Sequence, residues 1–273
     1  MFVQRRPKTA LESFLATVEL IYHGAVRNVR KTHGNAFMSI LMNVLQTIIM
    51  VMVFYVMFTV LGLRGMKLRG DFMIYIMSGI FLYMTHIKTL GAVVGAEGPT
   101  SPMMQHAPMN TVVSILSGML STLYIQFLSV LIVLFIYDVG FVDVEINDPI
   151  GCIGMILLAW FTGAAVGMVF LALKPWFPTP VSIASTIYQR ANMIASGKMF
   201  VANTLPSYLL AMFDWNPLFH AIDQARGYAF VNYFPRNSNL EYPIWLGIGL
   251  ITIGLMGEFY TRRHASASWS ARR

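Results

Sequence analysis

The fold of this chain is decided by two adjacent segments, LESFLATVELIYHGAVRNVRK (residues 11–31) and FMSILMNVLQTIIMVMVFYVMFTVL (residues 37–61). In the first segment, apolar residues recur at the three- and four-residue spacing of a helix with one apolar stripe. The opposite face is polar and includes Arg27, Arg30 and Lys31. Such a helix is expected to lie along the cytoplasmic surface of a membrane, whereas the second segment is long and apolar enough to cross one.

Composition places the rest of the chain in the membrane class as well. The 273 residues are 56% hydrophobic and 11% charged, with a mean hydropathy of +0.62, whereas soluble domains carry about 25% charged residues. The net charge of +7 does not indicate nucleic-acid binding, because the basic residues gather near the two ends rather than in one continuous patch.

About six stretches are long enough to cross a bilayer, whose hydrocarbon core requires roughly 20 apolar residues. They cover residues 37–61, 72–94, 112–137, 150–173, 180–200 and 242–260. We therefore expect one all-α membrane domain over residues 1–273. Its parts are a cytoplasmic tail and interface helix in 1–35, spans one to five in 36–200, an external segment in 201–241, the last span in 242–260 and a tail in 261–273. In the external segment, the apolar runs 205–213 and 218–230 predict two short helices that dip into the outer membrane interface.

The distribution of charge predicts that both termini are cytoplasmic, because basic residues are enriched on that side of a membrane. The acidic loop 138–148 fits the outside, and Lys174 fits the inside. Arg64, Lys67 and Arg69 conflict with this orientation, since they fall in a short loop that is expected outside. Orientation follows the overall bias of Lys and Arg, so the assignment is retained.

Several motifs of enzymes are missing from the sequence. It contains no G-x-x-x-x-G-K-[ST] loop, so we do not expect the chain to bind ATP through a P-loop. It also contains no H-E-x-x-H, no paired-cysteine metal site and no G-x-S-x-G. We therefore expect no catalytic residue and no metal ligand.

The fifth predicted span is the most polar one, and its candidate residues are Tyr188, Gln189, Arg190 and Lys198. An arginine in the middle of a span costs about 2.5–3.5 kcal/mol on insertion scales, so Arg190 should face protein or water. Two interpretations stay open: a pore-lining cation that meets a passing anion, or an internal partner for a carboxylate or a helix end. For Lys198 we favour the structural interpretation, because its long side chain can extend to the outer surface of the membrane.

Two further features have open interpretations. The pairs Gly163/Gly167 and Gly91/Gly95 have the G-x-x-x-G spacing of close helix packing, within one chain or between two. The loop after the second span carries Glu97, His106 and several methionines. It is either an adaptable partner surface or an ordinary hairpin.

The segment DWNPLFHAI (residues 214–222) contains the pattern W-N-P-L-x-H, formed by Trp215, Asn216, Pro217 and His220. This pattern resembles permeases of ABC-2 type polysaccharide exporters, and most closely the inner-membrane permease of Gram-negative capsular polysaccharide export. The order of the basic amphipathic start, the spans and the long external segment is similar over nearly the whole chain.

The resemblance implies a homodimeric permease in the bacterial inner membrane that binds no cofactor itself. A separate ABC ATPase subunit would bind ATP and Mg, and no nucleic acid would be involved. The cargo would be a lipid-linked, anionic polysaccharide, which periplasmic and outer-membrane proteins then receive.

The resemblance also implies roles for particular residues. Contact with the ATPase is expected from Arg27, Arg30, Lys31, Glu97 and His106. The substrate pathway is expected to include Arg190, Lys198, Tyr188 and Gln189. The external gate is expected to include Trp215, Asn216, Pro217 and His220.

Two alternatives to polysaccharide export stay open. One is an ABC-2 permease for a lipid or a drug, and the other is a membrane-embedded transferase that acts on lipid-linked sugars. The sequence has no carboxylate-rich or metal-binding loop on the expected cytoplasmic side, which disfavours the transferase. A neighbouring gene for a P-loop ATPase, together with capsule genes, would favour polymer export.

Overall fold

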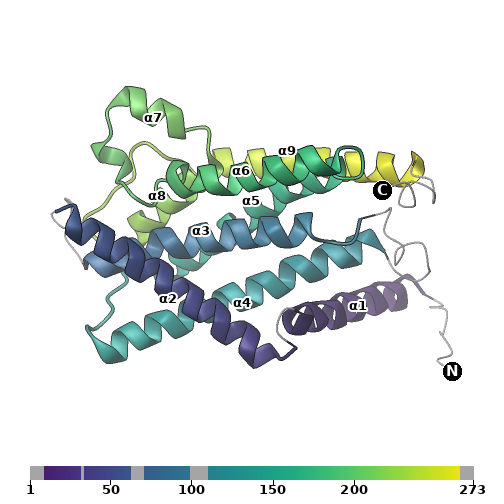
Figure 1. Cartoon of the computed structure of the whole chain (residues 1–273), viewed down its shortest axis with the longest axis horizontal. Coiled ribbons are helices and arrows are strands. Elements are labelled where there is room, and N and C mark those ends of the chain that lie inside the picture. The colour runs from purple at the N-terminus through teal and green to yellow at the C-terminus, as the bar shows by residue number, and fades with distance from the viewer. Residues whose placement is uncertain (1–8, 32–33, 63–70, 99–109, 265–273) are drawn as a thin grey trace.

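A computed structural model describes residues 9–31, 34–62, 71–98 and 110–264 (Figure 1), and helices dominate these residues. The α-helices are α1 (Ala10–Lys31), α2 (Ala36–Val60), α3 (Phe72–Val94), α4 (Thr111–Gly140), α5 (Pro149–Leu173), α6 (Pro178–Ala195), α7 (Ser207–Phe213), α8 (Pro217–Ala229) and α9 (Glu241–His264). A short 3-10 helix covers Ala202–Thr204.

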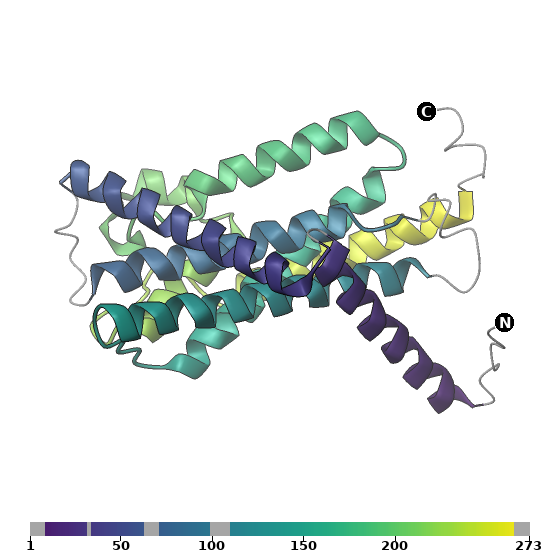
Figure 2. The same cartoon turned by 60° about the horizontal axis from the view of Figure 1, so that its bottom comes forward.

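The prediction of an all-α membrane protein is confirmed. Within the described residues, five helices are long and apolar enough to cross a membrane, namely α2, α3, α4, α5 and α9. The expected fifth span corresponds to α6, which runs in the same general direction (Figures 1 and 2). With 18 residues, α6 is shorter than those five helices and is not among them. Its polar residues Gln189, Arg190 and Asn192 lower its hydropathy.

The largest difference in helix boundaries also concerns α6. The sequence predicts a span to residue 200, but the helix ends at Ala195. Gly197 follows with a φ of 76°, a left-handed conformation that commonly ends helices. The two short helices predicted in residues 205–230 are α7 and α8, and Pro217 is the first residue of α8 as proline's fixed φ favours.

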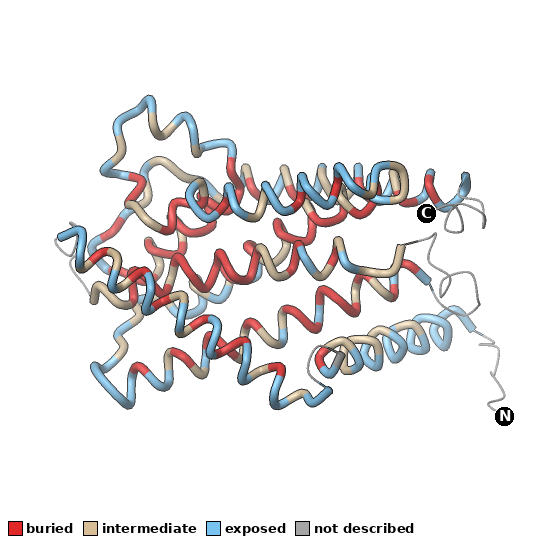
Figure 3. The backbone as a smooth tube through the Cα atoms, in the orientation of Figure 1, coloured by how far each residue is buried: buried red, intermediate tan, exposed pale blue. Residues whose placement is uncertain are grey.

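The centre of the bundle is formed by α3 and α5, the most buried of the long helices (Figure 3). A Cβ atom on Gly163 of α5 would lie only 2.4 Å from the carbonyl oxygen of His86 on α3, and one on Gly167 would lie 3.1 Å from that of Leu90. This G-x-x-x-G pair therefore packs two helices of one chain backbone to backbone. By contrast, a Cβ on Gly91 would meet no atom of another described element within 4 Å.

Helix α1 extends away from the spans at an angle (Figure 2), at the end of the bundle where α9 also finishes (Figure 1). We call this end the α1 end and the opposite one, where α7 and α8 lie, the α8 end. Ser117 of α4 donates a hydrogen bond to the carbonyl of Ile21 at 3.1 Å, which attaches α1 to the bundle. Leu11, Phe14 and Leu15 are exposed. The predicted amphipathic helix is thus present, and its position on a membrane surface stays a prediction.

Candidate functional site

A cleft of about 920 Å³ at the α1 end lies between α1, the end of α3 and the first half of α4. Arg27 and Arg30 line it from α1, and Glu97 lines it from the segment that follows α3. The backbone N–H of Glu97 donates to the Ser114 hydroxyl at 3.1 Å, which fixes this segment against α4. Residues that are nearly 70 positions apart in the sequence therefore share one cleft.

These three residues belong to the set predicted to contact an ATPase, and the structure brings them together. Of the other two, Lys31 is the last residue of α1. His106 lies outside the described residues. The cleft carries both signs of charge at its rim, an arrangement suited to a complementary protein surface.

Helix α6 touches the rest of the bundle along one narrow stripe. Its buried residues are Val181, Ser185 and Asn192, spaced by four and seven positions as on one helix face. Arg190 lies off this stripe and is exposed. Of the two interpretations from the sequence, an internal partner for Arg190 does not occur among the described hydrogen bonds and ion pairs.

Tyr188 and Gln189 attach α6 to α3 instead of projecting freely from it. The Tyr188 hydroxyl lies 3.1 Å from Nε2 of His86, whose Nδ1 lies 3.1 Å from the Thr162 hydroxyl. Because Thr162 donates its proton to the Leu158 carbonyl, His86 must donate from Nδ1 and accept from Tyr188 at Nε2. The backbone carbonyl of Gln189 accepts from the Tyr83 hydroxyl at 3.3 Å.

Lys198 does not extend to the surface. It is only 3% exposed, and its ammonium group lies 3.4 Å from the centre of the Tyr83 ring and 4.6 Å from that of Phe54. Within the described residues its Nζ has no hydrogen-bond partner. The ring faces therefore supply the electrostatic stabilisation that water would otherwise provide. In this conformation Lys198 is a packed residue and not an accessible wall of a passage.

Arg226 of α8 holds the loop that contains Lys198. Its guanidinium donates to the carbonyls of Gly197 (2.9 Å), Lys198 (2.8 Å) and Phe200 (2.6 Å), and it lies 4.2 Å from the centre of the Tyr75 ring. Arg226 is 1% exposed. From the sequence this arginine is visible only as a charge near the W-N-P-L-x-H pattern, and nothing local indicates that it is buried.

A second polar group stabilises α8 against the segment that leads to α9. The carboxylate of Asp223 accepts hydrogen bonds from the hydroxyls of Tyr233 and Ser238. Burial, together with the nearby Asp223 carboxylate, raises the pKa of Tyr233 well above its usual value. The hydroxyl therefore keeps its proton and remains a donor to Asp223.

The residues of the W-N-P-L-x-H pattern join three elements. The Asn216 side chain caps α8 by accepting from the Leu218 N–H (3.1 Å), and it donates to Asn192 Oδ1 (2.8 Å) and the Ala195 carbonyl (2.9 Å) at the end of α6. Pro217 starts α8 and is buried.

The same pattern also reaches the start of α9. Nδ1 of His220 accepts from the Asn239 N–H at 3.1 Å, so its Nε2 donates to the Asp214 carbonyl at 2.7 Å. Trp215 is exposed, and its carbonyl accepts from the Tyr242 hydroxyl. The pattern thus fixes α6, α8 and α9 to one another.

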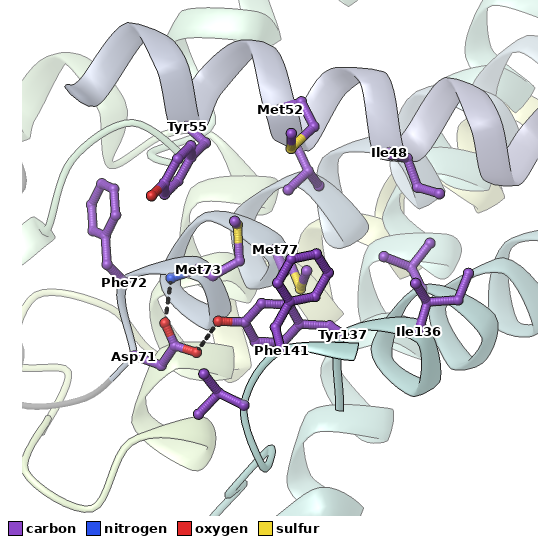
Figure 4. A pocket seen from close by; sticks show the side chains of 13 residues that line it. Ile48, Met52, Tyr55, Asp71, Phe72, Met73, Met77, Ile136, Tyr137 and Phe141 are labelled. Atoms are coloured by element: carbon purple, nitrogen blue, oxygen red, sulfur yellow. Dashed lines mark hydrogen bonds between the residues drawn. The ribbon is translucent and has the colours of Figure 1, made fainter. Parts of the chain in front are cut away.

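An apolar cavity of about 780 Å³ lies between α2, α3 and α4 toward the α8 end (Figure 4). Its walls include Met52 and Met77, and Asp71 is the one carboxylate among the described residues that line it. Asp71 accepts from the Tyr137 hydroxyl and from the Met73 N–H, so it serves as the N-cap of α3. Its acceptor capacity is used for structure, and we assign no function to this cavity.

Comparison with known proteins agrees with this architecture. Residues 19–230 match the model of the ABC-2 type transporter family, and the chain belongs to that family. No curated protein gave a match to the chain. Membership implies a multi-pass transport permease whose ATPase is a separate ABC subunit.

Proposed function

We propose that this chain is the permease subunit of an exporter that moves an anionic, lipid-linked polysaccharide of capsular type across the bacterial inner membrane. Two copies would pair with the ATPase, and the α1 end would face the cytoplasm. The basic residues Arg262 and Arg263 at the end of α9 support this orientation, as does the acidic loop 138–148 at the opposite end.

The observation that carries the cargo assignment is the exposure of Arg190. A cation at membrane depth is costly unless it meets water or an anion, and Arg190 projects from α6 on the side that does not pack against the bundle. A passage between two copies that is lined by this face would hold water and attract a negatively charged polymer. The W-N-P-L-x-H pattern supports polysaccharide as that polymer.

The proposed mechanism is mechanical. Closure of the ATPase dimer on ATP pushes against the cleft formed by Arg27, Arg30 and Glu97. Because α1 is attached to α4 through Ser117 and Ile21, this displacement passes into the spans. The loosely packed α6 then separates from its counterpart in the second copy.

A deletion strain complemented with variants tests the proposal. Loss of the gene should remove the surface polysaccharide and leave it inside the cell, and the wild-type chain should restore it. Arg190→Ala should restore it poorly while reaching the membrane in normal amounts, whereas Arg263→Ala, which removes an exposed arginine at the α1 end, should restore it fully. Normal surface polysaccharide in the deletion strain would refute the cargo assignment.

A further inference from the structure

A polar crevice of about 400 Å³ lies between α2, α3 and α4, in the half of the bundle toward the α1 end. Its polar lining includes Ser39, Asn43, Gln46, Lys88 and Gln126. Each of these residues belongs to a helix that is long and apolar enough to span a membrane. A polar cavity at such depth is unusual, because polar side chains in spans are expensive unless they have a partner or a function.

Part of this polarity is accounted for by packing of α2 against α4. Asn43 donates to the Ser129 hydroxyl at 2.9 Å, and its Oδ1 accepts from Gln126 at 3.1 Å. These bonds join the two helices and leave the Asn43 amide well satisfied. They do not involve Lys88 or Ser39.

Lys88 and Ser39 retain capacity to bind a ligand. Lys88 donates to Gln46 Oε1 at 2.7 Å, and an ammonium group carries three donors. Ser39 is 6% exposed, and within the described residues its hydroxyl has no hydrogen-bond partner. Among the described residues that line the crevice, none is a carboxylate. The available groups are the remaining ammonium donors of Lys88 and the Ser39 hydroxyl, which can also donate. Donors around a cation favour an anion.

The crevice adjoins the cleft at the α1 end. Thr122 and Ile125 of α4 line both of them. Lys88 lies six residues before the end of α3, which places it about 9 Å inside that end at 1.5 Å per residue. Positively charged side chains therefore occur both in the cleft, at Arg27 and Arg30, and deeper among the spans, at Lys88.

The outer wall of the crevice is apolar. Met42 lines it and is 46% exposed, and Leu45 and Ile49 continue the exposed apolar surface along α2. A molecule with an anionic head in the crevice would lay its hydrocarbon chain on this surface. We propose that the crevice binds the phosphate head of an anionic amphiphile, held by Lys88 and reached through the α1 cleft.

Two kinds of molecule have such a phosphate head and hydrocarbon chain, a membrane phospholipid and the lipid anchor of the cargo. Only the second of these rests on the proposed export function. Binding of either lipid is measured on the purified protein without ATPase or polymer. A failed export assay therefore leaves the phosphate site standing, and a failed binding assay leaves the export function standing.

The test measures lipid retention by native mass spectrometry of the purified full chain. The probes are phosphatidylglycerol, phosphatidylcholine with the same acyl chains, and a long-chain polyprenyl phosphate. Lys88→Gln should weaken binding of at least one of the two anionic lipids about tenfold, since a charge-assisted hydrogen bond to phosphate is lost, and Lys88→Arg should preserve it. Phosphatidylcholine should bind weakly to all variants.

The control is Lys174→Gln, because Lys174 is an exposed lysine near the same end that donates to the Val94 carbonyl and does not line the crevice. Equal losses in Lys88→Gln and Lys174→Gln, or no loss in either, would overturn the proposal. Anionic lipid should also protect Lys88, but not Lys174, of the wild-type chain from amine acylation. The acylation measurement uses the wild-type chain alone, so it does not depend on the folding of a variant. Failure of anionic lipid to protect Lys88 would also overturn the proposal.

Discussion

Among single residues, Arg226 makes three hydrogen bonds from a buried position at the α8 end. It satisfies three backbone carbonyls at once and packs on the Tyr75 ring. A guanidinium presents five N–H donors in a fixed plane, so a lysine or an amide cannot reproduce this pattern. The loop 197–200 therefore depends on one side chain.

Replacement of Arg226 by Met is expected to lower the free energy of unfolding by about 3 kcal/mol or more, because three buried carbonyls lose their donors. The free energy of unfolding of Arg226→Lys should lie between those of the wild type and Arg226→Met. Thermal unfolding in detergent measures the effect. The control is Arg236→Met, since Arg236 has an exposed side chain in the same external segment. Equal melting temperatures for the two Met variants would contradict the role given to Arg226.

Local sequence patterns could identify only part of this residue-level arrangement. Asn216 and Pro217 are recognisable because the start of a helix has a local signature. Arg226 and Lys198 are not, since the carbonyls that Arg226 contacts lie 26 to 29 positions away. Burial of a charge is decided by tertiary contacts that no short window contains.

At the scale of helices, the close contact between α3 and α5 depends on the missing side chain of Gly163, and this can be tested. Gly163→Ala should destabilise the protein by about 1–3 kcal/mol, as overpacking does, because the new methyl group would press on the His86 backbone. Gly91→Ala is the matched control on α3, because a Cβ there would meet no described atom outside its own helix within 4 Å. Melting temperatures of the two variants should differ clearly, and an unchanged Gly163→Ala would contradict the contact.

The α1 cleft supplies a second prediction at this scale. Charge reversal at both Arg27 and Arg30 should reduce co-purification of the ATPase, because two attractive contacts become repulsive. Reversal at both Arg262 and Arg263 changes the net charge equally at the same end of the bundle, outside the lining of the cleft. Co-purification that is unaffected by the first pair, or reduced equally by both, would remove the coupling role of this face.

Helical periodicity and apolar length were sufficient to predict nearly every helix, since both are local properties. The end of α6 was predicted five residues too late, because Met199 and Phe200 are apolar and extend the stretch in composition, although Gly197 interrupts the helix. The loose attachment of α6 was also not predictable. Its exposed face carries Ile183, Ile187 and Ile194, which in sequence look like residues of a packed face, and only the structure shows that they are exposed.

For the whole molecule, separation of transport from nucleotide hydrolysis is the main expectation. The purified chain alone should hydrolyse no ATP above a mock purification from the deletion strain, because its sequence contains no P-loop. Addition of the partner ATPase should produce hydrolysis in liposomes. Robust hydrolysis by the chain without its partner would contradict the division of labour that the family implies.

The glycine contact between α3 and α5 has a consequence for movement. Helices whose backbones touch cannot rotate or slide past each other without a clash, so this pair must travel as one rigid frame, with α9 held on α5 by Gly247 and Gly254. We expect a cyclic change of shape to fall to α6, which is tied to the bundle by polar anchors at Tyr188 and Asn192, while α1 stays attached to α4 through Ser117. These hydrogen bonds of α6 would break and re-form during each transport cycle, while the glycine contacts keep α3, α5 and α9 fixed relative to one another.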